Sequence, residues 1–344
     1  MKLNILILGS GGNAARNYVN SLKLEKKMIG KTVGIDIDEN GRYFSNTDKF
    51  YKIDKKLKIE SKTEFINNII KKETIDFIHA QPDKEVEYIS KISKYLKANF
   101  IQIDKKALKI YQNKDLTNTI WGDKFSNFIS YSYIEVLKNE ELFKYCIEKN
   151  GKAWVRKKQG AGSSGALPVK NIKQLKNWVN YWVEYRNAKP EEFIVSEYLN
   201  GQEFAVQILF WHGKLIHLQA RERVEYFFAN QMISGQSSTP SISRTINNFE
   251  LQNCAIDSIK TIEKEPHGIY CVDIKQNNEK NYVPMEVNYG RLFTTNYFFS
   301  QLGVNTPVDS IKKQFNLKVE KKINHIKEDI YCYRGLDMEM KVVD

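Results

Sequence analysis

The chain has 344 residues, which is enough for two or three domains and a sizeable buried core. Hydrophobic residues make up 42% and charged residues 27%, a balance that excludes a disordered tail, a collagen-like repeat and a membrane bundle. The 53 Lys and Arg residues outnumber the 41 Asp and Glu residues, and the net charge of +12 suits a nucleic acid, a lipid surface or a nucleotide equally well.

The first hundred residues alternate between short apolar runs and helical patterns. Leu3–Leu8 is an apolar run that ends in a glycine turn, and helical spacing follows it through Leu24. Further strands are predicted at Val33–Asp36, Ile75–Ile78 and Phe100–Ile103. This alternation predicts a doubly wound α/β domain with a parallel sheet over about residues 1–104.

The glycine turn leaves a dinucleotide-binding interpretation open. Gly9, Gly11 and Ala14 stand where a backbone could approach a pyrophosphate, and Asp36 could hold a ribose. Such turns also occur where a helix merely packs closely on its strand. An NAD-dependent oxidoreductase therefore stays one alternative.

A helix over about 105–120 and another over Glu140–Lys149 precede a more informative segment. Lys152–Arg156 is predicted as a strand and Ala166–Val169 as its return strand, joined by a basic loop over 157–165. The loop combines three glycines with neighbouring lysines and serines, a composition that can direct backbone N–H groups and hydroxyls at phosphate oxygens. The loop is not a Walker motif, because no Gly-Lys-Ser/Thr sequence follows.

The second half is predicted to be largely antiparallel sheet. A helix at Asn171–Asn187 and a strand at Glu192–Leu199 lead into a hairpin, Glu203–Phe210 with Lys214–Gln219. Ser234–Thr245 is interpreted as a mobile loop and Glu250–Lys264 as a helix.

Two carboxylates are predicted to face each other across a later hairpin. Residues 268–275 and 282–288 flank a polar turn, and a turn centred between residues 279 and 280 places Asp273 opposite Glu286. Asn288 lies two residues along on the same face. Opposed like charges destabilise a hairpin unless a positive charge lies between them. A divalent metal held by Asp273, Glu286 and Asn288 is one solution, and a lysine from a neighbouring strand is the other.

The order of these motifs resembles the ATP-grasp superfamily, in particular the carboxylate–amine ligases related to carbamoyl-phosphate synthase and biotin carboxylase. The motifs are the basic glycine loop, the segment Ser196–Glu203, and the hairpin that carries Asp273 and Glu286-Val287-Asn288. The resemblance implies a pre-ATP-grasp α/β domain at 1–104, linker helices and a mobile lid at 105–196, and a subdomain with the magnesium site at 197–344. The expected fold class is thus α/β plus α+β, a doubly wound parallel sheet followed by antiparallel sheets.

The resemblance also implies roles for individual residues. Those expected to bind ATP are Lys114, Arg156, Lys158, Gly160, Gly162, Ser163, Gly165, Glu197, Tyr198, Leu199 and Glu203. Asp273, Glu286 and Asn288 match the set that holds Mg²⁺ or Mn²⁺. Arg291 matches a neighbouring catalytic arginine, and Arg221 and Arg223 resemble an arginine pair that approaches phosphate or the acidic substrate. A surface pair with Glu222 or Glu225 is the alternative for either arginine.

The implied activity is an ATP-dependent ligation that activates a carboxylate as an acyl phosphate and joins it to an amine. The expected partners are small-molecule acids and amines, with no nucleic acid or membrane, and a homodimer stays open. The four cysteines lack metal spacing and no export signal is evident, so a cytoplasmic location is expected. A kinase or carboxylating enzyme of the same superfamily, the NAD-dependent oxidoreductase and a nucleic-acid binder are the rival interpretations.

Overall fold

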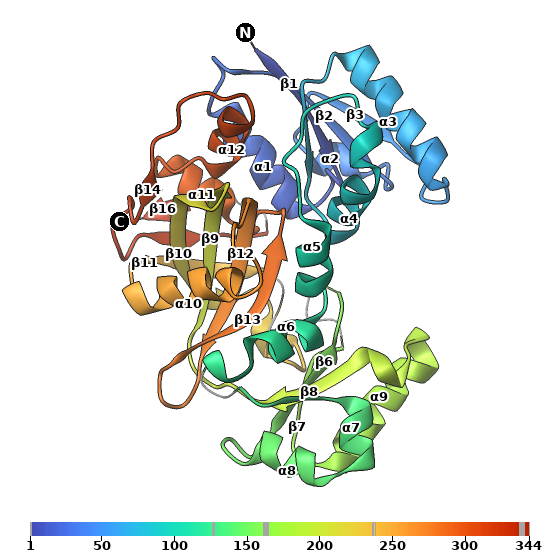
Figure 1. The fold of residues 1–344 in the computed structure, drawn as a ribbon, viewed down its shortest axis with the longest axis vertical. Helices are drawn as coiled ribbons and strands as arrows, with labels where there is room; N and C mark the ends of the chain where they lie inside the picture. Colours follow the sequence, from blue (N-terminus) through green and yellow to red (C-terminus); the bar gives the residue numbers. More distant parts are fainter. Residues whose placement is uncertain are drawn as a thin grey trace.

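Three sheets organise the part of the chain that the computed structural model describes, residues 2–125, 128–160, 165–235, 237, 239–336 and 341–343. In Figure 1 the N-terminal sheet lies at the top, the large C-terminal sheet at the left, and the small middle sheet at the bottom. Among the helices of these residues, none is both long enough and apolar enough to cross a membrane.

The N-terminal sheet is parallel and covered on both faces, as predicted. Its strand order is β3-β2-β1-β4, with β1 at Leu3–Leu8, β2 at Ile29–Asp36, β3 at Lys49–Lys52 and β4 at Phe77–Ala80. Ile5 and Ile7 of β1 pack with α1 (Asn13–Lys23) on one face, and Leu6 and Leu8 belong to the core cluster on the other. The second face is covered by α3 (Ile59–Glu73) and α4 (Asp83–Ile92), and α2 (Gly41–Phe44) connects β2 to β3.

The predicted strand at Phe100–Ile103 is wrong. Only an isolated bridge between Phe77 and Asn99 forms there, after which the chain leaves the sheet. Its apolar residues instead pack across to the C-terminal half, because Ile101 and Ile103 lie against the backbone at Gly268 and Gly290. The apolar alternation is therefore real, but it serves an interface between the two halves.

The single helix predicted over 105–120 is two helices, α5 (Lys105–Tyr111) and α6 (Lys114–Trp121). The break occurs at Asn113, whose side-chain oxygen accepts hydrogen bonds from the N–H groups of Asp115 and Leu116. This cap starts α6 afresh and places Lys114 at its first position.

The small middle sheet is antiparallel, with the order β5-β8-β6-β7. Its strands are β5 (Ser130–Ser132), β6 (Ala153–Lys157), β7 (Leu167–Val169) and β8 (Phe193–Glu197). The helices α7 (Tyr133–Lys138), α8 (Glu141–Ile147) and α9 (Ile172–Arg186) belong to the same unit and bury one core cluster with the strands. Residues 161–164, with Gly162 and Ser163 of the expected lid loop, lie outside the described residues.

The large sheet has the order β13-β12-β9-β10-β11-β15-β16, and β14 pairs with β10. Its strands are β9 (Glu203–Trp211), β10 (Lys214–Tyr226), β11 (Pro240–Ile246), β12 (Gly268–Gln276), β13 (Tyr282–Tyr289), β14 (Lys322–Ile323), β15 (Tyr331–Tyr333) and β16 (Lys341–Val343). The accompanying helices are α10 (Phe249–Lys260), α11 (Asn296–Gln301) and α12 (Thr306–Gln314). The short 3₁₀ helices of the chain are η1 (Ser93–Tyr95), η2 (Gly122–Lys124), η3 (Pro190–Glu192) and η4 (Ala229–Gln231).

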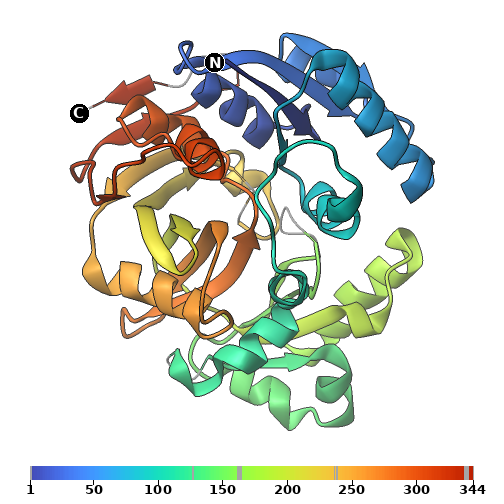
Figure 2. The same cartoon turned by 45° about the horizontal axis from the view of Figure 1, so that its top comes forward.

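Part of the predicted loop Ser234–Thr245 is the strand β11. From Pro240 onward the segment pairs antiparallel with β10, which extends seven residues beyond the predicted strand end at Gln219. The Ser and Thr content indicated a loop, but the pairing partner was not visible in the local pattern. Figure 2 shows the three sheet units arranged around a common centre. Residues of all three units line the cleft described below.

Candidate functional site

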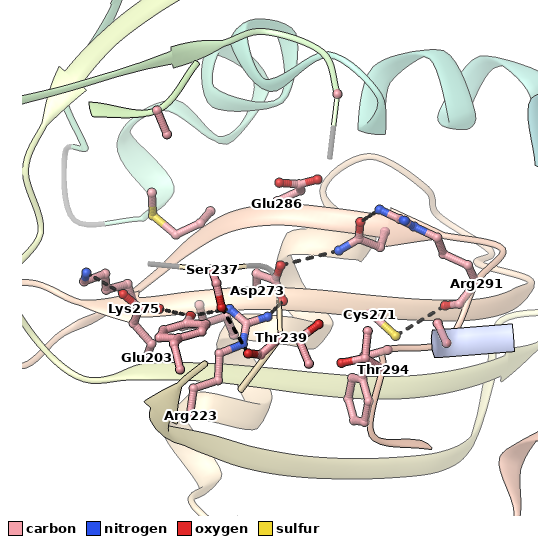
Figure 3. Close-up of a pocket in the computed structure, with 18 of the residues that line it drawn as sticks. Glu203, Arg223, Ser237, Thr239, Cys271, Asp273, Lys275, Glu286, Arg291 and Thr294 are labelled. Carbon is pink, nitrogen blue, oxygen red and sulfur yellow. Dashed lines mark hydrogen bonds and ion pairs between the residues drawn. The ribbon is translucent and has the colours of Figure 1, made fainter. Parts of the chain in front are cut away.

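The site is built on the hairpin of β12 and β13. Asp273 pairs with Glu286 in the antiparallel register, and Asn288 pairs with Cys271 two residues further along. The predicted pairing of Asp273 with Glu286 is therefore confirmed, and the two carboxylates share one face of the sheet. The register next to the turn is one residue away from the predicted one, with Gln276 opposite Tyr282, and an irregularity of the ladder between Asp273 and Ile274 makes up the difference. Figure 3 shows both side chains pointing into the pocket, with Arg291 at one end and Lys275 and Glu203 at the other.

A cleft of about 630 Å³ opens over this hairpin and takes its walls from all three sheet units. Residues from the β1–α1 turn, from α6 and β6, and from the large sheet contribute to it. Its described basic lining residues are Lys114, Arg156, Lys157, Arg221, Arg223, Lys275 and Arg291, against the acids Glu197, Glu203, Asp273 and Glu286. A cleft with an excess of cations and low-dielectric walls attracts an anionic ligand.

Arg223 neutralises Asp273. Its Nη2 lies 2.5 Å from Asp273 Oδ1, and both side chains are largely buried. Burial raises the pKa of Asp273 above its usual value, although the charge of Arg223 opposes this effect. The predicted alternative of a surface pair with Glu222 or Glu225 is wrong for Arg223, because Glu222 pairs with Arg244 on β11 instead.

Glu286 is surrounded by cations from outside its own hairpin. Lys114 Nζ lies 3.3 Å from Glu286 Oε2 and also donates to the carbonyl of Gly160 at 3.0 Å. Burial alone would raise the pKa of Glu286, but Lys114, Arg156 and Arg291 hold it below its ordinary value. The positive charges near the two carboxylates thus come from an arginine two strands away and from a lysine on α6. The sequence had suggested a metal or a lysine of a neighbouring strand instead.

Arg156 and Arg221 are cations with unused hydrogen-bonding capacity. Arg156 donates from Nη2 to the carbonyl of Met285 at 3.3 Å, while its buried Nε has no hydrogen-bond partner. Arg221 is only 1% exposed, lies over the Phe293 ring at 4.7 Å, donates to Ser243 Oγ and leaves Nε without a partner. Burial lowers the pKa of Arg221 to about 9. Buried donors of this kind favour an anion next to them.

The segment from Glu197 to Leu199 also lines the cleft, but the Glu197 side chain is already bonded. Its Oε1 accepts from the N–H of Ile129 at 3.1 Å, and Lys149 lies 3.3 Å from Oε2. Tyr198 is flanked by Trp154 at 6.0 Å between ring centroids, with Lys152 Nζ 3.9 Å above its ring. Backbone groups and the Tyr198 side chain are therefore the parts of this segment that are open to a ligand.

Glu203 lies in a network that the sequence motifs did not indicate. Lys275 Nζ is 2.7 Å from Glu203 Oε1, and the Tyr226 hydroxyl donates to Oε2. Arg223 in turn donates to the Tyr226 hydroxyl at 3.4 Å. The alternation of Asp273 and Lys275 along β12 could have pointed to Lys275, whereas Tyr226 lies in a segment whose structure the pattern did not reveal.

Two further residues of the expected ATP set lie beside the cleft without lining it. Lys158 pairs with Asp115 on α6 at 2.8 Å, and Gly165 accepts a hydrogen bond from Trp178 Nε1 at its carbonyl. Gly160 does line the cleft, and its φ of +114° explains the glycine there. Gly162 and Ser163 are among the residues that are not described.

Two side chains hold the guanidinium of Arg291 on the loop that follows β13. Its Nε lies 2.9 Å from Asp83 Oδ1 at the start of α4, and its Nη2 donates to Asn288 Oδ1. Asn288 in turn donates from Nδ2 to Asp273 Oδ2 at 3.5 Å. The sequence motifs predicted Arg291 but gave no signal for Asp83, which belongs to the N-terminal unit.

The N-terminal glycine turn lines the same cleft. Gly9, Gly12 and Asn13 are at its wall, together with Pro82 after β4. Asp36, the residue expected to hold a ribose in a dinucleotide site, accepts a hydrogen bond from the Gly11 N–H at 2.8 Å. The turn thus faces the carboxylate hairpin across a shared cleft.

The donor set fits a divalent cation such as Mg²⁺ in type. Two opposed carboxylates and an amide oxygen supply hard oxygen ligands, and the burial that raises the pKa of Asp273 would be relieved by a cation. Among the described residues no cluster of three or more His, Cys, Asp or Glu side chains could hold a metal. Phosphate oxygens or water would therefore have to complete the coordination.

Comparison with known proteins agrees with this geometry. Residues 131–295 match the sequence model of the ATP-grasp domain. The chain carries an ATP-grasp domain. The matched segment begins in β5 and ends just beyond Arg291, so it includes both carboxylates of the hairpin. The resemblance that the motifs indicated is confirmed, and no curated protein sequence gives a significant match.

Solved structures share the fold over nearly the whole chain at low sequence identity. L-amino acid ligase from Bacillus licheniformis superposes with a TM-score of 0.68 at 11% identity, covering 97% of this chain and 81% of its own. The biotin carboxylase domain of 2-oxoglutarate carboxylase from Hydrogenobacter thermophilus, with MgADP and bicarbonate, gives 0.67 at 13% identity, covering 96% and 74%. N5-carboxyaminoimidazole synthetase from Staphylococcus aureus with ADP gives 0.66 at 16% identity, covering 98% and 83%. The predicted fold class is therefore confirmed.

Proposed function

We propose that the protein is an ATP-dependent carboxylate–amine ligase. In this reaction ATP phosphorylates a substrate carboxylate, an amine attacks the resulting acyl phosphate, and ADP and phosphate leave. The observation that carries the proposal is the pair of carboxylates, Asp273 opposite Glu286, on the wall of a cleft lined by cations from three units. Phosphoryl transfer needs little covalent help from the protein. It needs the reacting groups in line and cations close to the negative charge that spreads over the phosphoryl oxygens in the transition state.

ATP would lie along the cleft with its base against the segment from Glu197 to Leu199 and its ribose near Glu203. Its phosphates would lie under Lys114 and Arg156, with the loop from Gly160 to Gly165, including Gly162 and Ser163, as a cover. Lys158, now paired with Asp115 beside the cleft, would have to turn toward the phosphates to reach them. Asp273, Glu286 and Asn288 would hold Mg²⁺ or Mn²⁺, which when bound neutralises phosphate charge. The charges of Lys114 and Arg223, now paired with these carboxylates, would then be available to the phosphates.

Arg291, with Arg221 and Arg223, would receive the acidic substrate. A carboxylate oxygen attacks the γ-phosphorus, a new O–P bond forms, and the bond to the bridging oxygen breaks, so that its electron pair leaves with ADP. The amine nitrogen then attacks the acyl carbon, phosphate departs with the C–O electron pair, and the amine loses a proton to solvent. Positioned cations lower the barrier of the first step because the transition state carries the charge that they face.

A carboxylating enzyme of the same superfamily is the second candidate. Two of the similar structures are named as a carboxylase domain with bicarbonate and as a carboxyaminoimidazole synthetase. In that case bicarbonate would be the acid that is activated. The glycine turn gives little support to an oxidoreductase, because it opens into the cleft of the ATP-grasp domain and Asp36 is bonded to Gly11.

The test is ADP release from Mg-ATP with paired panels of carboxylic acids and amines, including bicarbonate as one acid. We expect ADP release that requires both an organic acid and an amine and that stops on chelation of the metal. Asp273→Asn and Glu286→Gln should each lower kcat by about 100- to 1000-fold, as removal of one electrostatic stabiliser does elsewhere. Asp257→Asn, which removes an exposed acid on α10 outside the cleft, is the matched control.

Three outcomes would contradict the proposal. Turnover that is undiminished in both Asp273→Asn and Glu286→Gln would remove the metal assignment. ADP release with bicarbonate alone would favour the carboxylating enzyme, and a stable phosphorylated product without dependence on an amine would favour a kinase.

A further inference from the structure

The loop that carries Arg291 is anchored to the N-terminal unit at three consecutive residues. Gln81 donates from Nε2 to the carbonyl of Leu292 at 2.6 Å, and Asp83 pairs with Arg291. Gly290 has φ of +78°, and a Cβ there would lie 2.5 Å from Ile103 Cδ1 and 3.0 Å from Val86 Cγ1. The loop therefore belongs to the ATP-grasp unit by sequence but takes its position from the α/β unit.

The Gln81 contact is itself rigidly supported. Gln81 is 4% exposed, and its Oε1 lies 2.9 Å from Nε2 of His79 at the end of β4. The His79 ring stacks on Tyr18 of α1 with 3.9 Å between ring centroids. The backbone at Leu292 is thus fixed from the interior of the N-terminal unit, and the Asp83 carboxylate is presented from the next helix at a defined place.

The contacts to the Arg291 guanidinium leave one part of it available. Asp83 faces Nε and Asn288 accepts from Nη2, so both partners lie on the same edge of the planar group. Nη1 has no hydrogen-bond or ion-pair partner among the described residues. Arg291 lines the cleft and its side chain is 18% exposed, so Nη1 is accessible to a ligand.

An arginine side chain loses rotamer entropy when it is held in one geometry. Contacts to Asp83 and Asn288 hold the Arg291 side chain before substrate binds, so this entropy loss does not reduce the free energy of substrate binding. Preorganised donors of this kind are what stabilises developing charge in an active site. The fixed guanidinium also orients the Asn288 amide, which reaches Asp273.

We propose that Asp83 is a positioning residue: it acts through Arg291 and holds the guanidinium so that Nη1 faces the acidic substrate or the transferring phosphoryl group. The inference rests on the proposed ligase function for its kinetic consequence. The structural part, in which Asp83 fixes Arg291, does not depend on the reaction.

The kinetic test uses Asp83→Ala and Asp83→Glu in the full chain, with an acid–amine pair that the wild-type protein turns over. Loss of a residue that orients a site residue typically costs about 10- to 100-fold. We expect Asp83→Ala to lower kcat/KM for the acid by that factor while KM for ATP changes less than about twofold. Asp83→Glu, which keeps the charge, should recover part of the loss. Unchanged kinetics for the acid in a folded Asp83→Ala protein would overturn the inference.

Two comparisons separate positioning from general loosening of α4. Glu85→Gln removes another partly buried ion pair of the same helix, Glu85 with Lys62 at 2.9 Å, and should leave the kinetics unchanged. The double variant Asp83→Ala/Arg291→Ala should be no slower than Arg291→Ala alone, because Asp83 acts only through Arg291. Equal effects of Glu85→Gln and Asp83→Ala, or fully additive losses in the double variant, would contradict the proposal.

A readout without turnover keeps the inference distinct from the proposed function. In ¹⁵N-labelled protein the Arg291 Nε–H signal, assigned by its loss in Arg291→Lys, should be protected from exchange with water in the wild type, because Nε is buried against the Asp83 carboxylate. It should be lost to exchange in Asp83→Ala and keep its protection in Glu85→Gln. Absence of ADP release with every acid and amine would remove the ligase function alone, whereas a protected signal in Asp83→Ala would remove the role of Asp83.

Discussion

At the scale of single residues, the cleft is arranged by ion pairs that join distant parts of the chain. Arg223 and Asp273 are the closest of these pairs, and each side chain is more than three-quarters buried. Removing one partner of such a pair leaves a charge that is desolvated without compensation. The stability of the fold and the charge of the cleft therefore depend on the same side chains.

Arg223→Met tests this pair. We expect a loss of about 3 kcal/mol in the free energy of unfolding at pH 7, the low end for a broken buried pair, because Asp273 remains charged and largely buried. The pKa of Asp273, already raised by burial, should rise further above its unfolded value. A carboxyl with a raised folded pKa stabilises the fold at low pH and loses that contribution as pH rises. Urea unfolding should accordingly show the deficit shrinking from pH 7 to pH 4.

The double variant Arg223→Met/Asp273→Asn serves as the control, since it removes the uncompensated charge as well. It should recover much of the lost stability at pH 7 and show no shrinking deficit at lower pH. A deficit of the same size at every pH in the single variant would show that lost packing of the arginine, not charge, dominates.

At the scale of elements, the junction after β13 places the site against the N-terminal unit. Gly290 occurs there because its backbone has a positive φ and because Ile103 and Val86 approach too closely for a Cβ. Gly12, before α1, has an ordinary φ of −84° and would meet nothing within 4 Å. Of the two positions, only Gly290 therefore requires a glycine on backbone and packing grounds.

Gly290→Ala should therefore lower the free energy of unfolding by about 1 to 3 kcal/mol, the usual cost of overpacking. Gly12→Ala should change it by less than about 0.5 kcal/mol, although it adds a methyl group to the turn at the cleft wall. Thermal and urea unfolding of the two variants measure the difference directly. Equal stability of the two alanine variants would show that the interface at Gly290 yields easily.

At the scale of the whole molecule, a partly buried carboxyl joins the linker helices to the large sheet. Glu263, just after α10, accepts hydrogen bonds at 2.9 Å from the hydroxyls of Tyr111 on α5 and Tyr270 on β12. Burial raises the pKa of Glu263 to about 6. Between about pH 4.5 and pH 6 the folded protein therefore keeps a proton on Glu263 that the unfolded chain has already released.

The stability that Glu263 contributes should be present below about pH 4.5 and be lost as pH rises through about 6. Glu263→Gln keeps an acceptor for both tyrosines and cannot ionise. The melting temperature of the wild type, relative to that of Glu263→Gln, should decrease between pH 4.5 and pH 6.5. A constant difference across this range would contradict the raised pKa.

Local pattern determined much of this protein's organisation. The alternation in β12 and β13 predicted that Asp273 faces Glu286, and the two residues do pair. The turn alone would have placed Asp273 opposite Met285, and the irregularity between Asp273 and Ile274 restores the predicted pair. The glycine spacing and motif order indicated the ATP-grasp domain in the same local way. The division at residues 104 and 196 and the ligand roles of the site residues stay predictions.

Contacts between distant residues were decided only by the tertiary structure. No local pattern pairs Arg223 with Asp273, Lys275 with Glu203, or Gln81 with Leu292, which are 50, 72 and 211 residues apart. The strand expected at Phe100–Ile103 was wrong for the same reason, since its apolar side chains face the other half of the chain. Periodicity reports which face of an element is buried, whereas the partner on that face depends on how the units close on one another.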